Sequence, residues 1–352
     1  MRDSPRSPSV LNLPDQYEPT LDLRRRETAI KDIKDFFERQ LAAALGLCRV
    51  TAPLFVRSGT GINDDLNGVE QPVRFTVKED NHAQVEIVQS LAKWKRQALA
   101  DYGFSVGEGL YTDMNALRPD ETIDELHSIY VDQWDWEKII ASADRTFETL
   151  EAAVRAIYDC ICRTEFHLAS EYSHIRPVLP ERIHVVTAEE LCRRWPTVDP
   201  RERENRICRE HGAVFVAGIG GTLPDGSLHD GRAPDYDDWT TPNSAGGRGL
   251  NGDILFWNPV LNRAFEISSM GIRVDPATLR EQLRTRRLED RLELAFHRRL
   301  LADELPQTMG GGVGQSRLCM FLLRAAHVGE VACGVWPDAM REACQRVNIT
   351  LL

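Results

Sequence analysis

Segments with the character of β-strands follow one another in pairs along this sequence, and a turn joins the two members of each pair. The turn Glu79-Asp80-Asn81 lies in the first pair, and Asn258-Pro259 lies in the last. Strands joined in this way form hairpins, and helical segments stand between the hairpins. This order predicts an α+β fold, with an antiparallel sheet flanked by helices. The expected pairs are residues 73–77 with 85–88, 109–117 with 129–136, and 254–257 with 264–268.

Apolar residues recurring at steps of three and four predict the helices. In residues 28–45, Thr28 can cap the start and Gly46 can end the helix in a left-handed turn. The long amphipathic helix is expected over residues 142–166. Further helices or helix starts are expected at residues 91–102, Thr187 to Glu190 (a capping box), Asp199-Pro200, 276–302 and 315–325.

Three other segments complete the expected fold. Residues 49–56 resemble a strand, but Pro53 cannot donate to a ladder, which predicts an edge or interface strand. Residues 183–186 and 213–219 are apolar strands. The polar stretch 222–252 is a loop so long that it is either functional or disordered.

The composition excludes several classes of protein. A net charge of −11 over 352 residues argues against a nucleic-acid surface, and the run Arg24-Arg25-Arg26 is expected to be a solvated face or a neighbour of acidic groups. The eight cysteines contain no CxxC pair, which indicates reduced thiols in the cytoplasm. No apolar run is long enough for a membrane span. Residues 1–14 do not have the pattern of a secretory signal, and residues 1–20 are expected to be disordered.

A glycine run, residues 310–314, precedes the last of these helices. Glycines before a helix leave backbone N–H groups available to an anion. The run lacks the Lys-Ser/Thr of a P-loop, but Arg317 follows it by one turn. On its own this is a weak signal for a nucleotide site.

Carboxylates are concentrated in two places. Asp235, Asp237 and Asp238 crowd with Arg232, which indicates either a site for a cation or polar ligand, or a solvated turn. Glu266 lies inside an apolar run, so it needs a basic residue or a metal ion as its partner. Asp253 either only begins its strand or joins Glu266.

Cations and aromatic residues mark two further segments. Residues 93–96 hold three cations that cannot share one helix face, so one of them is expected to reach a ligand. Arg118 precedes residues 131–136, where two tryptophans stand beside two aspartates. That run is either a core strand with a solvated rim or the wall of a pocket.

Taken together, these motifs closely resemble those of the ammonia-dependent asparagine synthetases (aspartate–ammonia ligases). The resemblance runs in family order from about residue 28 to 337. The matching stretches are Ser90-Leu-Ala-Lys-Trp-Lys-Arg96, Gly107-Glu-Gly-Leu-Tyr111, Ala116-Leu-Arg-Pro-Asp120, Tyr130-Val-Asp-Gln-Trp-Asp-Trp136, Arg232-Ala-Pro-Asp-Tyr-Asp-Asp-Trp239, Asn251-Gly-Asp-Ile254, the stretch from Phe265 to Arg273, and Gly310-Gly-Gly-Val-Gly-Gln-Ser-Arg317.

The resemblance implies a fold like the catalytic core of class II aminoacyl-tRNA synthetases, as a single catalytic domain over residues 21–352 and a homodimer. The helix at 28–45 with Pro53 is similar to the dimer-forming first motif. The hairpin that carries Arg118 is similar to the second, and the glycine loop with Arg317 is similar to the third.

The resemblance also implies the chemistry. Aspartate would attack the α-phosphate of ATP to give β-aspartyl-AMP, and ammonia would then displace AMP. Mg²⁺ would bind the ATP phosphates, and neither nucleic acid nor a membrane would take part. The implied catalytic residues are Asp64, Arg118, Asp237 and Arg317. Aspartate would be bound by Ser90, Lys95, Gln133, Asp135, Ser269 and Arg273. ATP would be bound by Arg118, Arg232, Ser268, Gly312, Gly314 and Arg317, and the metal by Asp253 and Glu266.

The sequence departs from the family pattern at a few positions. Residues 1–20 extend beyond the usual start, and Gln89 stands where histidine is expected. Asp65 and Asn67 replace an expected Asn and Ser beside Asp64.

Three alternative functions would each require different features of the sequence. An aminoacyl-tRNA synthetase would share the core but needs an anticodon-binding domain and a basic surface. A non-catalytic binding protein would be expected to lose charged site residues. A glutamine-dependent route would need an amidotransferase domain with a reactive cysteine, often N-terminal, whereas the first cysteine here is Cys48.

Overall fold

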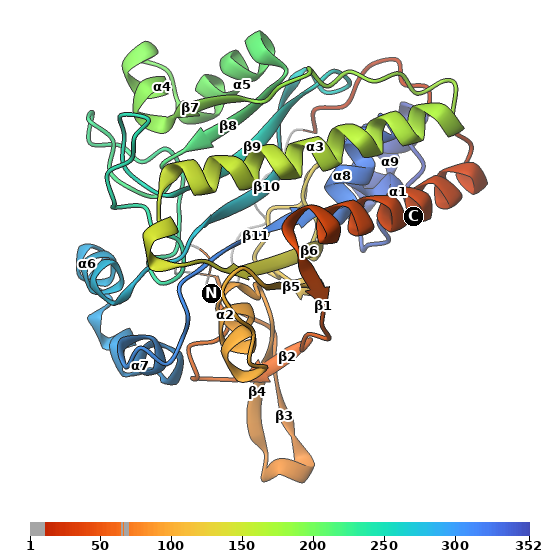
Figure 1. Cartoon of the computed structure of the whole chain (residues 1–352). Coiled ribbons are helices and arrows are strands. Elements are labelled where there is room, and N and C mark those ends of the chain that lie inside the picture. Colours follow the sequence, from red (N-terminus) through yellow and green to blue (C-terminus); the bar gives the residue numbers. More distant parts are fainter. Residues whose placement is uncertain (1–10, 65, 67–69) are drawn as a thin grey trace.

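An eight-stranded sheet forms the centre of the protein (Figure 1). The computed structural model describes residues 11–64, 66 and 70–352. The strands of the sheet are β1 (Leu47–Arg49), β5 (Gly109–Leu117), β6 (Tyr130–Ile139), β7 (His184–Thr187), β8 (Ala213–Ala217), β9 (Asn251–Asn258), β10 (Arg263–Ile272) and β11 (Thr308–Gly314). Their order is β1-β5-β6-β11-β10-β9-β8-β7. All neighbours are antiparallel except at the two edges, where β1 runs parallel to β5 and β7 runs parallel to β8. The predicted α+β fold is confirmed.

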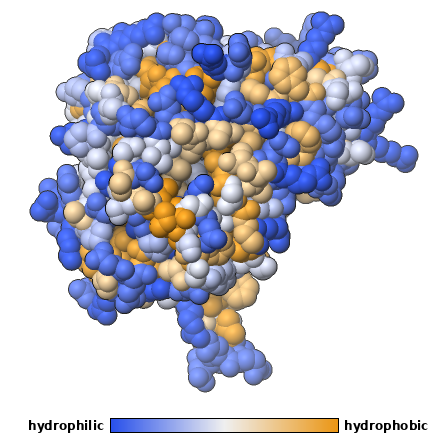
Figure 2. All heavy atoms as spheres, viewed as in Figure 1, coloured by the Kyte–Doolittle hydropathy of each residue, from blue (hydrophilic) through white to orange (hydrophobic). Residues whose placement is uncertain are grey.

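A second, three-stranded sheet has the order β2-β4-β3, and its β3–β4 hairpin projects from the body of the protein (Figure 1). Its strands are β2 (Phe55–Arg57), β3 (Arg74–Val77) and β4 (Ala83–Ile87). The predicted strand at 49–56 is therefore two strands in two sheets, because Pro53 interrupts it. Phe55 and Phe75 are exposed on the small sheet, and their ring centroids lie 5.4 Å apart. Figure 2 shows hydrophobic spheres on this projecting part.

The helices of the described residues are α1 (Leu23–Leu45), α2 (Ala92–Asp101), α3 (Phe147–Glu171), α4 (Ala188–Arg194), α5 (Pro200–His211), α6 (Pro276–Arg286), α7 (Ala295–Leu301), α8 (Gln315–Leu322) and α9 (Asp338–Arg346). Short 3₁₀ turns are η1 (Lys78–Asp80), η2 (Ser142–Asp144), η3 (Glu289–Glu293) and η4 (Val328–Glu330). Within the part of the chain that the structure describes, no helix is long and apolar enough to cross a membrane.

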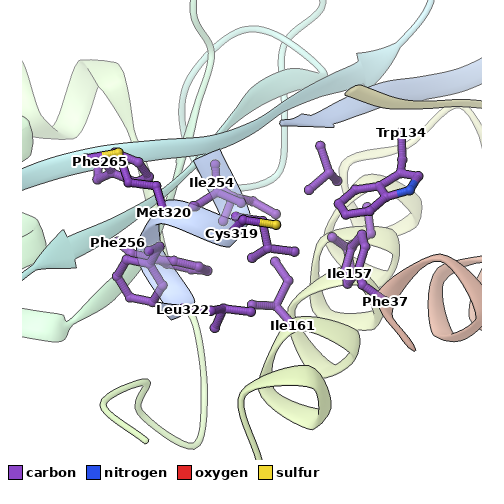
Figure 3. Close-up of a cluster of buried hydrophobic side chains, with 14 of the residues drawn as sticks. Phe37, Trp134, Ile157, Ile161, Ile254, Phe256, Phe265, Cys319, Met320 and Leu322 are labelled. Carbon is purple, nitrogen blue, oxygen red and sulfur yellow. The ribbon is translucent and has the colours of Figure 1, made fainter. Parts of the chain in front are cut away.

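The main core lies between one face of the sheet and the helices α1, α3 and α8. Figure 3 shows Phe37 of α1 and Ile157 of α3 against Trp134 of β6, and Met320 of α8 near Phe265 of β10. Trp134 and its neighbour two residues on, Trp136, are fully buried in this core. Because side chains alternate along a strand, the residues between and beside these tryptophans face the opposite side. One face of β6 therefore builds the core and leaves the other for polar groups.

Two helix starts differ from the prediction. The first helix begins five residues earlier than expected, because Asp22 caps it by accepting a hydrogen bond from the Arg25 N–H. Thr28 lies inside that helix and its hydroxyl donates to the Arg24 carbonyl. The helix expected at 142–166 begins as a 3₁₀ turn, and α3 itself starts after Thr146, which is its cap. Gly46 does end α1 in a left-handed turn, as predicted.

The glycine run is a strand, not a loop. Residues 310–314 belong to β11, where they pair with β6 on one side and β10 on the other. A Cβ on Gly310 would lie 1.9 Å from Glu137 Oε2, and one on Gly312 would lie 2.4 Å from Gln133 Oε1. The glycines therefore make room for polar side chains of β6, which is a different use from the expected anion loop.

Residues 11–20 pack against the body, so the prediction that residues 1–20 are disordered is wrong for this part. The Tyr17 hydroxyl donates to Glu330 Oε2 at 3.1 Å, and the Asn12 N–H donates to Glu125 Oε2 at 3.2 Å. Leu11 and Leu13 pack on the core. Residues 1–10 lie outside the described residues.

Replacement of Gly310 by alanine tests why β11 is rich in glycine. The new methyl would collide with Glu137, a buried carboxylate in the centre of the sheet, so we expect the free energy of unfolding to fall by about 3 kcal/mol. Chemical denaturation followed by circular dichroism measures the change.

Gly247→Ala is the matched control. Its Cβ would meet Thr187 at 3.3 Å, a contact that a small shift relieves, so its stability should change by less than about 1 kcal/mol. Equal losses in both variants would contradict this explanation of the glycine strand.

Candidate active site

Two cavities lie side by side, bordered by the middle strands of the sheet, α2 and the loops after β2, β4, β5 and β8. The main cavity has a volume of about 280 Å³ and the adjoining cavity about 190 Å³. They share Arg118, Glu121, Gln133, Glu266 and Gly312, so they form one continuous site.

The structure gathers most of the residues predicted from sequence around this site. The main cavity is lined by Asp64, Ser90, Lys95, Arg118, Gln133, Asp135, Arg232, Asp237, Glu266, Ser269, Arg273 and Gly312. The adjoining cavity adds Gly314 and Arg317. Ser268 and Asp253 line neither cavity. Asp65 and Asn67 lie outside the described residues.

Lys95 is the cation of α2 that reaches the main cavity. Its Nζ donates to Asp135 Oδ1 at 2.5 Å and to the Gly311 carbonyl at 3.0 Å. Burial lowers the pKa of the lysine, against the opposing pull of Asp135. Asp135 Oδ2 is buried and lacks a hydrogen-bond partner among the described residues, so it can still accept from a ligand.

The neighbouring cations of α2 have other partners. Lys93 pairs with Asp235 at 3.0 Å, and Arg96 donates to the Val274 and Pro306 carbonyls. The expectation that one cation of this run reaches inward is thus met by Lys95.

Arg273 lies at the centre of a buried ionic network. Its Nη2 donates to Glu137 Oε2 at 2.8 Å and its Nε to Glu137 Oε1 at 3.0 Å, while Nη1 binds Asp237. Glu137 also accepts from the Thr308 hydroxyl at 2.7 Å. Burial opposes the charge of Glu137, but Arg273 and Lys95 outweigh it and lower the pKa of that carboxyl. The network fixes β6, β10 and β11 to the loop after β8.

The three carboxylates of the loop at 235–238 are kept apart by separate cations. Asp235 accepts from Lys93 and from His297 Nε2, each at 3.0 Å, and burial is outweighed by the lysine charge, so its pKa is lowered. Asp238 binds Arg145. Only Asp237 of the three lines the main cavity. The loop is therefore an ordered wall of the site rather than a solvated turn.

Arg232 holds Asp253 away from the cavity. Its Nη2 donates to Asp253 Oδ1 at 2.7 Å, and its Nε lies 3.6 Å from Asp237 Oδ2. Burial works against the charge of Arg232, but Asp253 and Asp237 raise its pKa. Asp253 is thus the partner of a cation, and no group of three or more metal-ligating side chains occurs among residues 11–64, 66 and 70–352.

A β-bulge in β10 explains which of its side chains face the site. The pairing with β9 slips between Glu266 and Ser268, so one extra residue, Ile267, interrupts the alternation. Glu266 and Ser269 consequently both line the main cavity, although they are three residues apart. Ser268 points away, and its buried Oγ has no partner in the described structure. The sequence could not reveal this because the bulge has no signal in residue type.

Glu266 finds a basic partner, as its place in an apolar run required. Its Oε2 lies 3.4 Å from Arg317 Nη1, which also donates to the Glu266 carbonyl at 3.2 Å. The carboxylate is 42% exposed, because it faces the cavities instead of the core.

Arg118 stands where β5 ends and faces both cavities. Its Nε and Nη2 donate to the Gln89 carbonyl at 3.3 and 3.2 Å. Its charge is not matched by a carboxylate within 4.0 Å in the described part of the chain. Residues 131–136 serve both of the purposes that were expected as alternatives. The two tryptophans lie in the core, and Gln133 and Asp135 line the main cavity.

Sequence reasoning missed several residues of the site. Glu137 continues the alternation of β6 and could have been found from it. Tyr236, whose pKa is raised by burial, lines the main cavity beneath the Arg273 guanidinium. The other missed lining residues include Glu70, Gln89, Asp120 and Glu121.

Comparison with known proteins decides the family. The model of the aspartate–ammonia ligase family matches residues 24–348. The chain belongs to this family. An aspartate–ammonia ligase of Bacteroides thetaiotaomicron is 52% identical over 344 residues, which are 98% of this chain and 100% of that one. One of Clostridium perfringens is 54% identical over 97% of this chain and 99% of its own.

This extent of matching corrects one expectation. The alignment with the Bacteroides relative covers 98% of this chain, so it includes most of residues 1–20. The expectation that residues 1–20 extend beyond the family's usual start is therefore wrong for most of these residues.

Solved structures share the fold at low identity. Asparaginyl-tRNA synthetase of Pyrococcus horikoshii, complexed with asparaginyl-adenylate, superposes with a TM-score of 0.65 at 15% identity over 89% of this chain and 70% of that one. The Entamoeba histolytica enzyme gives 0.63 at 12% identity over 88% and 66%. The predicted likeness to class II synthetases is confirmed for the fold.

Replacement of Glu137 by glutamine tests the ionic network. A buried guanidinium would lose one carboxylate, so we expect stability at pH 7 to fall by about 3 kcal/mol. The pKa of Glu137 is lower in the folded state than in the unfolded chain. Its contribution is therefore present above the unfolded pKa and is lost as pH falls through the folded pKa. Denaturation measured at a series of pH values should show that the free energy of unfolding falls less steeply with decreasing pH in the variant than in the wild type.

Glu79→Gln on the exposed η1 turn is the matched control and should leave both stability and its pH dependence unchanged. An E137Q protein with the same acid profile as the wild type would contradict the role given to Glu137.

Proposed function

We propose that this chain makes L-asparagine from L-aspartate, ATP and ammonia, with AMP and pyrophosphate as the other products. The observation that carries the proposal is that Arg118, Glu266 and Arg317 face one shared cavity in a member of the aspartate–ammonia ligase family. Two guanidinium groups beside each other fit a polyphosphate, because each can bind phosphate oxygens in bidentate fashion.

The first step activates aspartate. Its β-carboxylate oxygen attacks the α-phosphorus of ATP, and the bond to pyrophosphate breaks. This reaction needs positioning and neutralisation of charge on the phosphoryl group, which Arg118 and Arg317 supply. Arg232, Gly312 and Gly314 border the space that the nucleotide would occupy. Ser268 points away from it, so a contact with ATP through its hydroxyl is not part of the proposal.

The main cavity is the proposed aspartate pocket. Asp135 Oδ2 can accept from the substrate ammonium, while Lys95 and Arg273 supply positive charge to its carboxylates. Gln133, Ser90 and Ser269 offer neutral hydrogen bonds around them. Burial of these groups makes each contact stronger than it would be in water.

The second step transfers the acyl group. The nitrogen of ammonia attacks the β-carbonyl carbon, AMP leaves, and a proton passes from nitrogen to a base. Asp64 and Asp237 line the same cavity and are the proposed carboxylates for binding ammonium and taking its proton. Asp237 is already bound by Arg273, which holds it in place beside the cavity.

Magnesium is expected with ATP, and it would neutralise phosphate charge. Glu266 fits as a ligand, because its carboxylate is 42% exposed on the cavity, and Mg²⁺ needs only one or two carboxylates besides phosphate and water oxygens. Asp253 does not fit as placed, since its Oδ1 is taken by Arg232.

The direct test supplies purified protein with ATP, Mg²⁺, L-aspartate and ammonium chloride. Asparagine, AMP and pyrophosphate should form in equal amounts, and glutamine should not replace ammonium. Arg118→Ala should lower kcat/KM by about 10²- to 10³-fold, because a donor to the transferring phosphoryl is lost.

Arg298→Ala removes a cation from an exposed pair with Glu293, away from both cavities, and should retain full activity. Absence of ammonium-dependent asparagine in the wild type would end the proposal. Charging of tRNA with aspartate, or ligand binding without turnover, would support a different function.

The homodimer and a cytoplasmic location belong to the same proposal. β1 is an edge strand of the large sheet, and Leu54 and Phe55 are exposed beyond it, which suits pairing with a second copy. All eight cysteines are free, as expected of a reducing compartment.

Light scattering coupled to gel filtration should give about twice the chain mass of 39.8 kDa. Phe55→Glu should shift the protein toward the monomer, because it buries a charge in the proposed interface. Phe166→Glu, which changes another exposed phenylalanine on α3, is the control. A wild-type mass equal to one chain would contradict the dimer.

A further inference from the structure

Gln89 is held in the wall of the main cavity by its backbone. It lies in the link between β4 and α2. Its N–H donates to Asn63 Oδ1 at 2.9 Å, and its carbonyl accepts two hydrogen bonds from the Arg118 guanidinium. Both backbone polar groups are therefore fixed, and the side chain has little freedom in where it points.

The side-chain amide of Gln89 has no hydrogen-bond partner among the described residues. The residue is fully buried, lines the main cavity, and neither Nε2 nor Oε1 has a hydrogen-bond partner in the part of the chain that the structure describes. A buried polar group without a partner destabilises the fold, so an apolar residue would be more stable here. Such a group in a cavity wall indicates a ligand that completes its hydrogen bonds.

The charge beside the amide indicates what that ligand is. The other cations of the main cavity are matched: Lys95 by Asp135, Arg232 by Asp253, and Arg273 by Glu137. Arg118 has no such carboxylate among the described residues and is bonded through the Gln89 carbonyl. An unmatched guanidinium next to a primary amide with two free N–H groups fits an anion.

We propose that Gln89 is a phosphate-binding residue: its Nε2 donates to a non-bridging oxygen of the α-phosphoryl group that Arg118 neutralises. This inference rests on the proposed function, because the anion is the α-phosphate of ATP and then of the aspartyl adenylate. The residue thus has two effects. Its carbonyl orients the Arg118 guanidinium, and its amide adds a neutral donor to the same anion.

Binding of AMP and of adenosine separates the phosphate contact from all others. Gln89→Met keeps the length of the side chain and removes the amide. A hydrogen bond to a charged group contributes about 1.5–3 kcal/mol, so the Kd for AMP, measured by calorimetry, should rise about 10- to 100-fold. The Kd for adenosine should stay within about twofold, because no phosphate is present.

Gln89→Glu sharpens the test. It keeps an acceptor, removes the donors and adds a negative charge, so AMP should bind less tightly to this variant than to Gln89→Met. If the amide instead accepted a hydrogen bond from ammonium, the glutamate variant would retain AMP affinity and change only the KM for ammonium. That result would overturn the proposal, as would an unchanged Kd for AMP in Gln89→Met.

Gln97→Met and Gln97→Glu are the matched controls. Gln97 lies on α2 close by in sequence, and its amide donates to Asp101 outside both cavities. These variants should bind AMP as the wild type does.

Two further measurements keep the outcomes apart. Wild-type asparagine formation tests the proposed function by itself, and AMP affinity in the variants tests Gln89. A crystal structure of the wild type with an aspartyl-adenylate analogue covers the case of variants that do not fold. Nε2 is expected within about 3.2 Å of a phosphate oxygen, and a separation beyond about 4 Å would refute the contact.

Discussion

The buried pair of Glu137 and Arg273 is the interaction on which the rest of the site depends. It joins β6 to the residue that follows β10, across β11, and Arg273 also binds Asp237 in the long loop after β8. Two charges so deeply buried are stable only with good geometry and further favourable contacts. Thr308 donates a hydrogen bond to Glu137, and Lys95 Nζ lies 4.0 Å from the same carboxylate as a second positive charge. β11 must pass beneath the pair, and a side chain at Gly310 would occupy the space of the carboxylate. The glycine strand and the ionic network are therefore one structural solution.

The sheet separates stability from chemistry by the simple alternation of its side chains. On β6, Trp134 and Trp136 lie in the hydrophobic core, while Gln133 and Asp135 face the main cavity and Glu137, on the same side of the strand, lies in the buried ionic network. The core face needs only apolar residues that fill space, so it tolerates wide change in sequence. Superposition on asparaginyl-tRNA synthetases at 12% and 15% identity agrees with this. The polar face is constrained by individual partners instead.

Sequence patterns predicted the hairpins and most helices, because local rules decide those features: alternation, capping residues and turns. Most of the residues that gather at the site were implied by the resemblance to the aspartate–ammonia ligases. They failed where tertiary contacts decide. The glycines of β11 have the composition of a loop, yet neighbouring polar side chains require a strand without Cβ atoms. The bulge at Ile267 turns Ser268 away from the cavity, and Asp253 is matched to Arg232 at a distance of 21 residues.

The matching of charges in the cavity also bears on how an acidic protein would bind the polyanion of the proposed reaction. Among the described residues, seven carboxylates and four cations line the main cavity, so the formal balance of these residues is negative. Three of the cations are each paired with a neighbouring carboxylate that holds the side chain in place. Their N–H groups are therefore oriented, but their positive charge is already balanced. Arg118, and Arg317 through its long contact with Glu266, keep the capacity to accept phosphate. A ligand that brings both negative phosphates and a positively charged ammonium group would match the unpaired guanidinium charge and the excess carboxylate charge at once. Binding of the phosphates alone, or of the ammonium group alone, would leave the other charges unmatched, so the proposed function would favour binding of nucleotide and amino acid together.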